Sequence, residues 1–159
     1  MLNIYITNLG KYNEGELIGE WVSLPCSNLE EVYDRIGIND EYEEMFITDY
    51  ETDFAGLEVG EYDNIEDLNE QAEELESVDA ELIAAILEAE GGTIWDAIER
   101  AEDATFWPGM TLEEVAYELV EECYDLPEIA QRYFDYAAFA RDLSFDGYTE
   151  TSAGVVCLY

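Results

Sequence analysis

The residues of this chain whose types and spacing suit chemistry are carboxylates. Asp49, Glu51 and Asp53 alternate as the first ligands of an EF-hand calcium loop do, and Ca²⁺ prefers oxygen ligands of this kind. Such a loop also needs a glycine directly after its third ligand and a bidentate glutamate at its end. Phe54 and Gly60 occupy those two positions here. The match to a calcium loop therefore fails.

Other reaction chemistry has little support. The chain has no histidine, which excludes Ser-His and Cys-His nucleophile pairs and the ordinary zinc sites. Cys26, Cys123 and Cys157 show no Cys-x-x-Cys spacing and lie in apolar contexts, so we expect buried thiols in a reducing cytoplasm. An acid-base pair of two carboxylates remains an open alternative, but the sequence has no motif or glycine-rich loop that would bind a substrate for it. We expect no enzyme activity, no catalytic residue, no cofactor and no metal ion.

The number of carboxylates indicates a different use. The chain has 41 Asp and Glu against five Lys and Arg, a formal net charge of −36 on 159 residues. Between Arg35 and Arg100 it has no basic residue. Duplex DNA carries one negative charge per about 1.7 Å of axis, so this charge equals that of roughly 60 Å of duplex. Such a protein repels nucleic acid and anionic membranes and suits partners that bind DNA.

Two simpler explanations for the charge are weaker. Intrinsic disorder accompanies high net charge but needs few apolar residues, and 48% of this chain is hydrophobic and 13% aromatic. General acidic solubility, as in halophilic proteins, would surround an otherwise recognisable site. The chain has no apolar run long enough to span a bilayer, and Met1 to Gly10 lacks the basic start of a signal peptide.

The segment 65–76 shows how elements position the acids. Apolar residues recur there at three- and four-residue steps, as on one face of a helix. The opposite face carries only acids, among them Glu66, Glu70 and Glu74, one turn apart. Each like-charged pair costs roughly 0.2–0.5 kcal/mol, so helix stability does not explain the pattern. The distance of about 5–6 Å between their β-carbons is of the order of neighbouring phosphates.

The flanking segments predict sheet modules. Residues 1–60 predict strands at 4–6, 17–24 and 46–47, and a helix that begins at a Ser27–Glu30 capping box and ends at Gly37. Residues 104–159 predict a strand near 104–107, a helix capped by Thr111 and Glu114, helical segments from Pro127 and over 133–143, and a closing hairpin at 145–159.

These patterns predict an α+β fold of three modules. The divisions are an N-terminal α+β module at 1–60, an acidic helical module at 61–103 and a C-terminal α+β module at 104–159. We expect the three amphipathic helices of the middle module to pack as a bundle. Self-repulsion and the linear charge density of DNA favour an elongated chain of these modules.

Segments at both ends of the chain resemble the ArdA antirestriction family. Ile4–Leu17 resembles the opening of that family, as do Ile36–Glu44 and Asp49–Glu51. Leu126–Tyr136, followed by Ala140–Leu143, resembles the region of its antirestriction motif. Residues 58–109 resemble the family only in being acidic and helical.

The resemblance implies a cytoplasmic bacterial protein carried on mobile genetic elements. Family members are elongated DNA mimics that occupy the DNA-binding groove of type I restriction-modification enzymes, often inhibiting modification as well, and that dimerise through the C-terminal module. Arg132 and Arg141 lie in this least acidic region, where two copies can approach. Tyr133, Phe134 and Asp135 are as compatible with an ordinary helix core as with a motif. The implied antirestriction motif and dimer region contains Leu126, Pro127, Tyr133, Phe134, Asp135 and Tyr136.

We therefore expect a non-catalytic antirestriction protein that competes with DNA for type I enzymes, forms a homodimer and binds neither nucleic acid nor membrane. The alternatives are a DNA mimic directed at another DNA-binding protein, and an acidic enzyme or metal-ion binding protein. The residues expected to mimic phosphates are Asp40, Glu41, Glu43, Glu44, Asp49, Glu51, Asp53, Glu58, Glu61, Asp63, Glu66, Asp67, Glu70, Glu73, Glu74 and Glu76.

Overall fold

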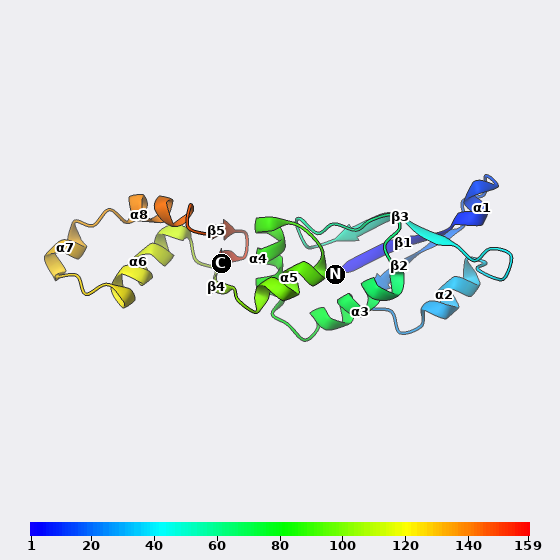
Figure 1. Cartoon of the computed structure of the whole chain (residues 1–159), viewed down its shortest axis with the longest axis horizontal. Coiled ribbons are helices and arrows are strands. Elements are labelled where there is room, and N and C mark those ends of the chain that lie inside the picture. Colours follow the sequence, from blue (N-terminus) through cyan, green and yellow to red (C-terminus); the bar gives the residue numbers. More distant parts are fainter. The chain divides into compact units, whose positions relative to one another are not determined.

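The computed structural model describes every residue from Met1 to Tyr159 and confirms the α+β class, with eight helices and two three-stranded sheets. Its contacts divide the chain into two compact units, Met1–Val78 and Asp79–Tyr159. None of the helices has both the length and the apolar character needed to cross a membrane. Figure 1 shows the elements of each unit.

The first unit is an antiparallel sheet with helices along one side. The strand order is β2-β1-β3, and α3 packs against β2. In Figure 1, α2 and α3 run along the same side of this sheet. Its elements are β1 (Leu2–Asn8), α1 (Leu9–Asn13), β2 (Gly19–Leu24), α2 (Leu29–Arg35), β3 (Met45–Thr52) and α3 (Ile65–Leu75).

Alternation along the strands separates the two faces of this sheet. Leu2, Ile4 and Ile6 of β1 are buried, and Val22 of β2 lies opposite Ile4 on the same face. The side chains between them, including Tyr5, point to the other face, because successive strand residues alternate. The three strands predicted here are confirmed, and the short helix α1 follows directly after β1.

The second unit surrounds a smaller sheet. Strand β6 lies between β4 and β5 and is buried along its whole length, and α4 packs on this sheet and against α5. Helix α6 packs against α8. The elements are α4 (Ala80–Glu90), α5 (Ile94–Ala101), β4 (Thr105–Pro108), α6 (Leu112–Cys123), α7 (Glu128–Arg132), α8 (Tyr136–Leu143), β5 (Tyr148–Thr151) and β6 (Gly154–Cys157).

Helix starts show which capping patterns form. Thr111 and Glu114 make the predicted capping box, in which the Glu114 carboxylate accepts from the Thr111 amide at 2.8 Å. This backbone hydrogen bond, with one from the Thr111 hydroxyl, lowers the pKa of Glu114. The predicted Ser27–Glu30 box is wrong, because α2 begins one residue later, after Asn28, whose side chain makes no capping hydrogen bond.

Three local predictions are corrected. The three middle helices do not form one bundle, because α3 packs on the first sheet while α4 packs on α5 and the second sheet. The helix predicted over 133–143 begins only at Tyr136. Of the thiols, Cys157 is buried, but Cys26 is half-buried and Cys123 is exposed at the end of α6. The division at 1–60, 61–103 and 104–159 and the elongated arrangement stay predictions.

Candidate functional site

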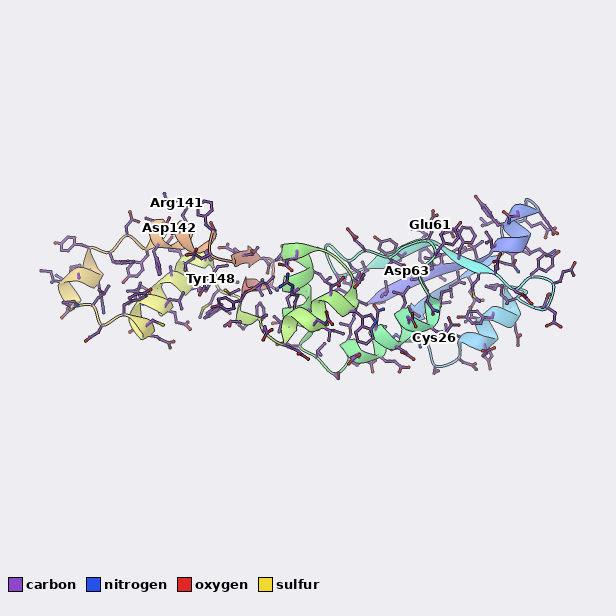
Figure 2. The ribbon with its side chains drawn as sticks, viewed as in Figure 1. Cys26, Glu61, Asp63, Arg141, Asp142 and Tyr148 are labelled. Carbon is purple, nitrogen blue, oxygen red and sulfur yellow. The ribbon has the colours of Figure 1, made fainter.

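All acidic residues predicted to mimic phosphates lie in the first unit and have exposed side chains. Those at 40–44 lie in the loop before β3, Asp49 and Glu51 in β3, those at 53–63 in the following loop, and those at 66–76 in α3 and its C-cap. Figure 2 labels Glu61 and Asp63 in the segment between β3 and α3. The fold therefore leaves these carboxylates in solvent.

These carboxylates have almost no positive partner in the chain. Of the predicted set only Asp53 makes an ion pair, with the N-terminal amine at 3.1 Å. In the first unit Lys11 pairs with Glu14 at 3.3 Å, and Arg35 pairs with Glu20 at 2.7 Å. Neither carboxylate belongs to the predicted set. Each basic side chain of the chain forms an ion pair with an acid outside the predicted set, so the predicted surface keeps its negative charge.

The ion pair between Arg35 and Glu20 is bidentate. Arg35 Nε donates to one carboxylate oxygen at 2.9 Å and Nη2 to the other at 2.7 Å. These hydrogen bonds lower the pKa of Glu20. The fork geometry is the one in which a guanidinium recognises carboxylate or phosphate. A carboxylate of this surface can accept a foreign arginine in the same way.

Helix α3 is held so that its acidic face points outward. Ile65, Leu68 and Ala72 are buried, and the Asn64 side chain caps the first turn by accepting from the Asp67 amide at 3.0 Å. Tyr33 of α2 donates its hydroxyl to Glu66 at 2.8 Å. Burial, and next this hydrogen bond, raise the pKa of Tyr33. The predicted apolar stripe is confirmed, although it packs on a sheet.

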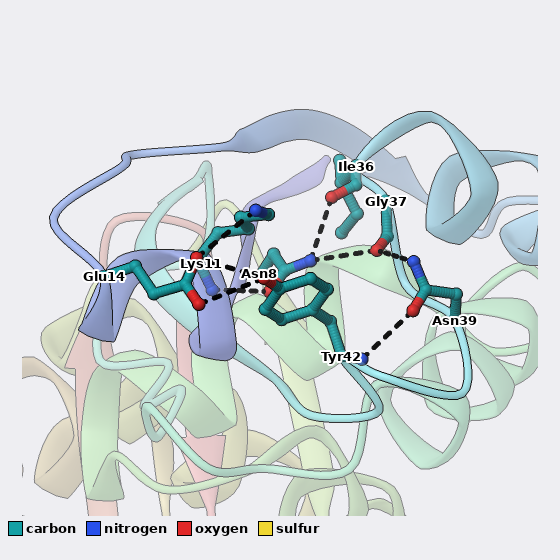
Figure 3. A network of polar contacts seen from close by, with 7 residues as sticks. All are labelled: Asn8, Lys11, Glu14, Ile36, Gly37, Asn39 and Tyr42. Carbon is teal, nitrogen blue, oxygen red and sulfur yellow. Dashed lines mark hydrogen bonds and ion pairs between the residues drawn. The ribbon is translucent and has the colours of Figure 1, made fainter.

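The acidic loop at 40–44 is positioned by a buried polar network, drawn in Figure 3. Asn8 is fully buried, and its Nδ2 donates to the carbonyls of Ile36 and Gly37 at 3.1 and 3.2 Å. Its Oδ1 accepts from the Lys11 amide at 3.0 Å, which caps α1. Asn8 thus connects the end of β1 to the start of the acidic loop.

Gly10 and Tyr42 complete this anchor beside Asn8. The ring of Tyr42 lies against Gly10, where an added Cβ would collide with it. The hydroxyl of Tyr42 donates to Glu14 at 3.0 Å, and Lys11 Nζ lies 4.3 Å from its ring centroid. Sequence reasoning missed Asn8 as a positioning residue. The available signal was an asparagine, a preferred N-cap, at the end of a strand whose apolar residues are buried.

The arrangement suits long-range attraction of cations rather than chemistry at one point. The structure brings no group of three or more Asp, Glu or Cys side chains into a position to hold a metal ion. The acids are instead distributed over a loop, a strand and a helix face. A surface of one sign raises the local concentration of oppositely charged partners and accelerates their association.

The predicted antirestriction segment lies in the second unit. Pro127 is the N-cap of α7, and Tyr133 follows that helix with 81% of its surface exposed, so it is not a core residue. Phe134 packs on Tyr136 with ring centroids 4.9 Å apart. Asp135 caps α8 by accepting from the Ala138 amide at 2.9 Å. A structural role is thus visible for Asp135 and Phe134, whereas Tyr133 has an exposed ring.

The two arginines of this region make exposed pairs within the unit. Arg132 lies 3.5 Å from Glu128, and Arg141 lies 3.7 Å from Asp142, the pair labelled in Figure 2. Surface pairs of this kind contribute little stability, of the order of 0–1 kcal/mol. Their role in bringing two copies together stays a prediction.

Comparison with known proteins gives one finding. The family model described as "Antirestriction protein (ArdA)" matches residues 4–157, which is nearly the whole chain. The match includes both the acidic surface of the first unit and the segment 126–136 of the second. A search of the curated proteins finds no match to the chain.

Proposed function

The chain belongs to the ArdA family of antirestriction proteins, a family of non-enzymatic inhibitors of restriction enzymes, and on that premise we propose that it is a DNA mimic. It occupies the DNA-binding groove of a type I restriction-modification enzyme in place of DNA. The carboxylates of residues 40–76 engage lysine and arginine side chains that otherwise contact phosphates. Inhibition is then competitive, and it needs no catalytic residue, cofactor or metal ion.

One observation carries this proposal. The acids of residues 40–76 are all exposed, and only Asp53 among them is paired with a positive charge of the chain. A protein surface normally mixes both signs, because like charges side by side are destabilising. Bringing this surface against a basic groove replaces repulsion within the mimic by attraction to the enzyme, as phosphate contacts do for DNA.

The proposal extends to assembly and location. A homodimer formed through the C-terminal region, which contains the exposed Tyr133, doubles the acidic surface that one complex presents. The protein acts in the cytoplasm of a bacterial host, where restriction enzymes meet incoming mobile genetic elements. The same charge excludes nucleic acid and anionic membranes as ligands.

Salt dependence tests the electrostatic part of the proposal. We expect the logarithm of the binding constant for a purified type I enzyme to fall linearly with the logarithm of the salt concentration. A slope of several units, as for a ligand that replaces several phosphate contacts, is the expected result. The measurement is a titration of the enzyme followed by fluorescence anisotropy between roughly 50 and 200 mM salt.

Thermal unfolding of the free protein provides the control for this titration. Salt screens repulsion between the carboxylates, with a Debye length of about 10 Å at 0.1 M, so the melting temperature rises over the same range. Weaker binding therefore does not come from unfolding. An affinity that does not change with salt would show that the contact is mainly apolar and would overturn the mimicry.

A further inference from the structure

The face of the first sheet that lies opposite the buried core carries an aromatic row. Trp21 on β2 and Asp49 on β3 are the cross-strand partners of Tyr5 on the central strand, one on each side of it. The rings of Tyr5 and Trp21 meet edge to face, with centroids 5.4 Å apart. Trp21 is 43% exposed although it lies in the middle of a strand.

Further rings turn the row into a hollow. Tyr12 of α1 meets Phe46 of β3 with centroids 5.3 Å apart, and Phe46 stacks on Tyr62 at 5.9 Å. Together with Tyr5 and Trp21, the first two rings line an open hollow of about 460 Å³, which we call the aromatic hollow. A volume of this size accommodates a large side chain of a partner.

Two carboxylates border the aromatic hollow without a cation. Asp49 and Glu61 are among its lining residues, and both are exposed. The Asp49 carboxylate accepts one hydrogen bond, from the neighbouring Tyr50 amide at 2.9 Å, and neither carboxylate forms an ion pair. Fixed aromatic faces beside unpaired carboxylates thus present two kinds of attraction for one positive, planar group.

We propose that the aromatic hollow binds an arginine side chain of the basic partner. A guanidinium stacks on tryptophan and tyrosine faces, and its remaining N–H groups form a fork that fits a carboxylate. Lysine fits less well, because its ammonium is compact, strongly hydrated and unable to stack as a plane. Aromatic sheet faces also stack nucleic acid bases, but a net charge of −36 repels the phosphates that accompany them.

This inference rests on the proposed function, since it assumes that the partner is a basic DNA-binding protein, and it adds selectivity for arginine to a general attraction. Long-range attraction by opposite charge alone does not distinguish lysine from arginine. An aromatic hollow beside carboxylates holds one arginine in a defined orientation, and it fixes how the first unit lies on the partner surface.

The first test compares two peptide probes on the full-length protein. Hexa-arginine and hexa-lysine carry the same charge, and their affinities are measured by calorimetry at one salt concentration. We expect the arginine peptide to bind roughly 3- to 10-fold more tightly, as one stacked guanidinium contributes about 0.5–1.5 kcal/mol. Trp21→Thr removes the largest ring while keeping a strand-forming residue, and we expect it to lower this preference.

Trp95 provides the matched control, because it is 40% exposed on α5 of the second unit and lies outside the hollow. Trp95→Gln leaves the arginine preference unchanged. Equal affinity of the two peptides for the wild-type protein overturns the inference, and so does a preference that Trp21→Thr leaves unchanged.

A second pair of variants keeps the inference testable if Trp21→Thr does not fold. The first double variant is Asp49→Asn with Glu61→Gln, and the second is Glu70→Gln with Glu74→Gln. Both change the net charge equally, but only the first pair borders the aromatic hollow. We expect the arginine preference to fall only in the first variant, and an equal change in both overturns the inference. Failure of the protein to displace DNA from a type I enzyme would instead contradict the proposed function.

Discussion

Neutralising the acidic face of α3 is expected to lower the affinity for a type I enzyme by roughly 10- to 100-fold. Exposed ion pairs contribute about 0.2–1 kcal/mol each, so five lost contacts sum to a few kcal/mol, and 1.4 kcal/mol is tenfold. A single change such as Glu70→Gln is expected to alter the affinity less than about fivefold. The measurement is displacement of a labelled duplex from the enzyme by each variant. The five residues changed together to Gln or Asn are Glu66, Asp67, Glu70, Glu73 and Glu74.

A variant with the same charge change elsewhere separates a local surface from total charge. Five exposed acids of the second unit make no hydrogen bond or ion pair through their side chains and lie outside the predicted surface. Neutralising them is expected to alter affinity only slightly, because they do not belong to the surface that is proposed to contact the groove. Equal losses in the two fivefold variants would contradict a surface at 40–76, and one dominant carboxylate in α3 would indicate a localised site. The control residues are Glu99, Glu102, Asp103, Glu121 and Glu122.

Asn8→Ala is expected to lower the melting temperature by roughly 10–20 °C. The change removes the cap of α1, which costs about 1 kcal/mol, and leaves the buried carbonyl of Ile36 without its hydrogen bond, which costs about 1–3 kcal/mol. For a unit of this size, 1 kcal/mol corresponds to roughly 4–8 °C. Thermal unfolding followed by circular dichroism measures the shift.

Asn39→Ala is the matched control for this prediction. Asn39 also makes hydrogen bonds within the same loop, to Gly37 and from the Glu41 amide, but it is exposed. Water replaces its hydrogen bonds, so the expected shift is within about 4 °C. If both variants shift equally, the buried network does not anchor the acidic loop.

Periodicity in the sequence predicted the elements better than it predicted their neighbours. The alternation at Ile4 and Ile6 and the three-four steps from Ile65 to Leu75 correctly identified β1 and α3. An apolar stripe indicates that a helix buries one face, but it does not indicate which surface covers that face. A sheet and a second helix bury the same stripe equally well, and the predicted middle bundle was wrong for this reason.

The positions of two residues at helix ends explain two further differences. Asp135 caps α8 by accepting from the Ala138 amide, so the helix cannot extend back to Tyr133 as predicted. Cys123 lies at the last position of α6, where no further turn or neighbouring element covers it, and the thiol is exposed.

The acidic surface and its anchor differ in how far sequence determines them. Charge is a property of each residue, so the exposure of the acids within residues 40–76 followed directly from their type. The role of Asn8 depends on carbonyls 28 and 29 residues away, which only the fold brings to its side chain. The aromatic hollow likewise arises from the register that aligns Tyr5 with Trp21 and Asp49.

Competition with DNA tests the central claim most directly. A type I enzyme is titrated with a labelled duplex at several fixed concentrations of this protein. If the two ligands share one groove, the apparent dissociation constant of the duplex rises linearly with the protein concentration, while the signal at saturation stays constant. A complex that contains enzyme, duplex and protein together, or an apparent dissociation constant that does not change, would contradict the account.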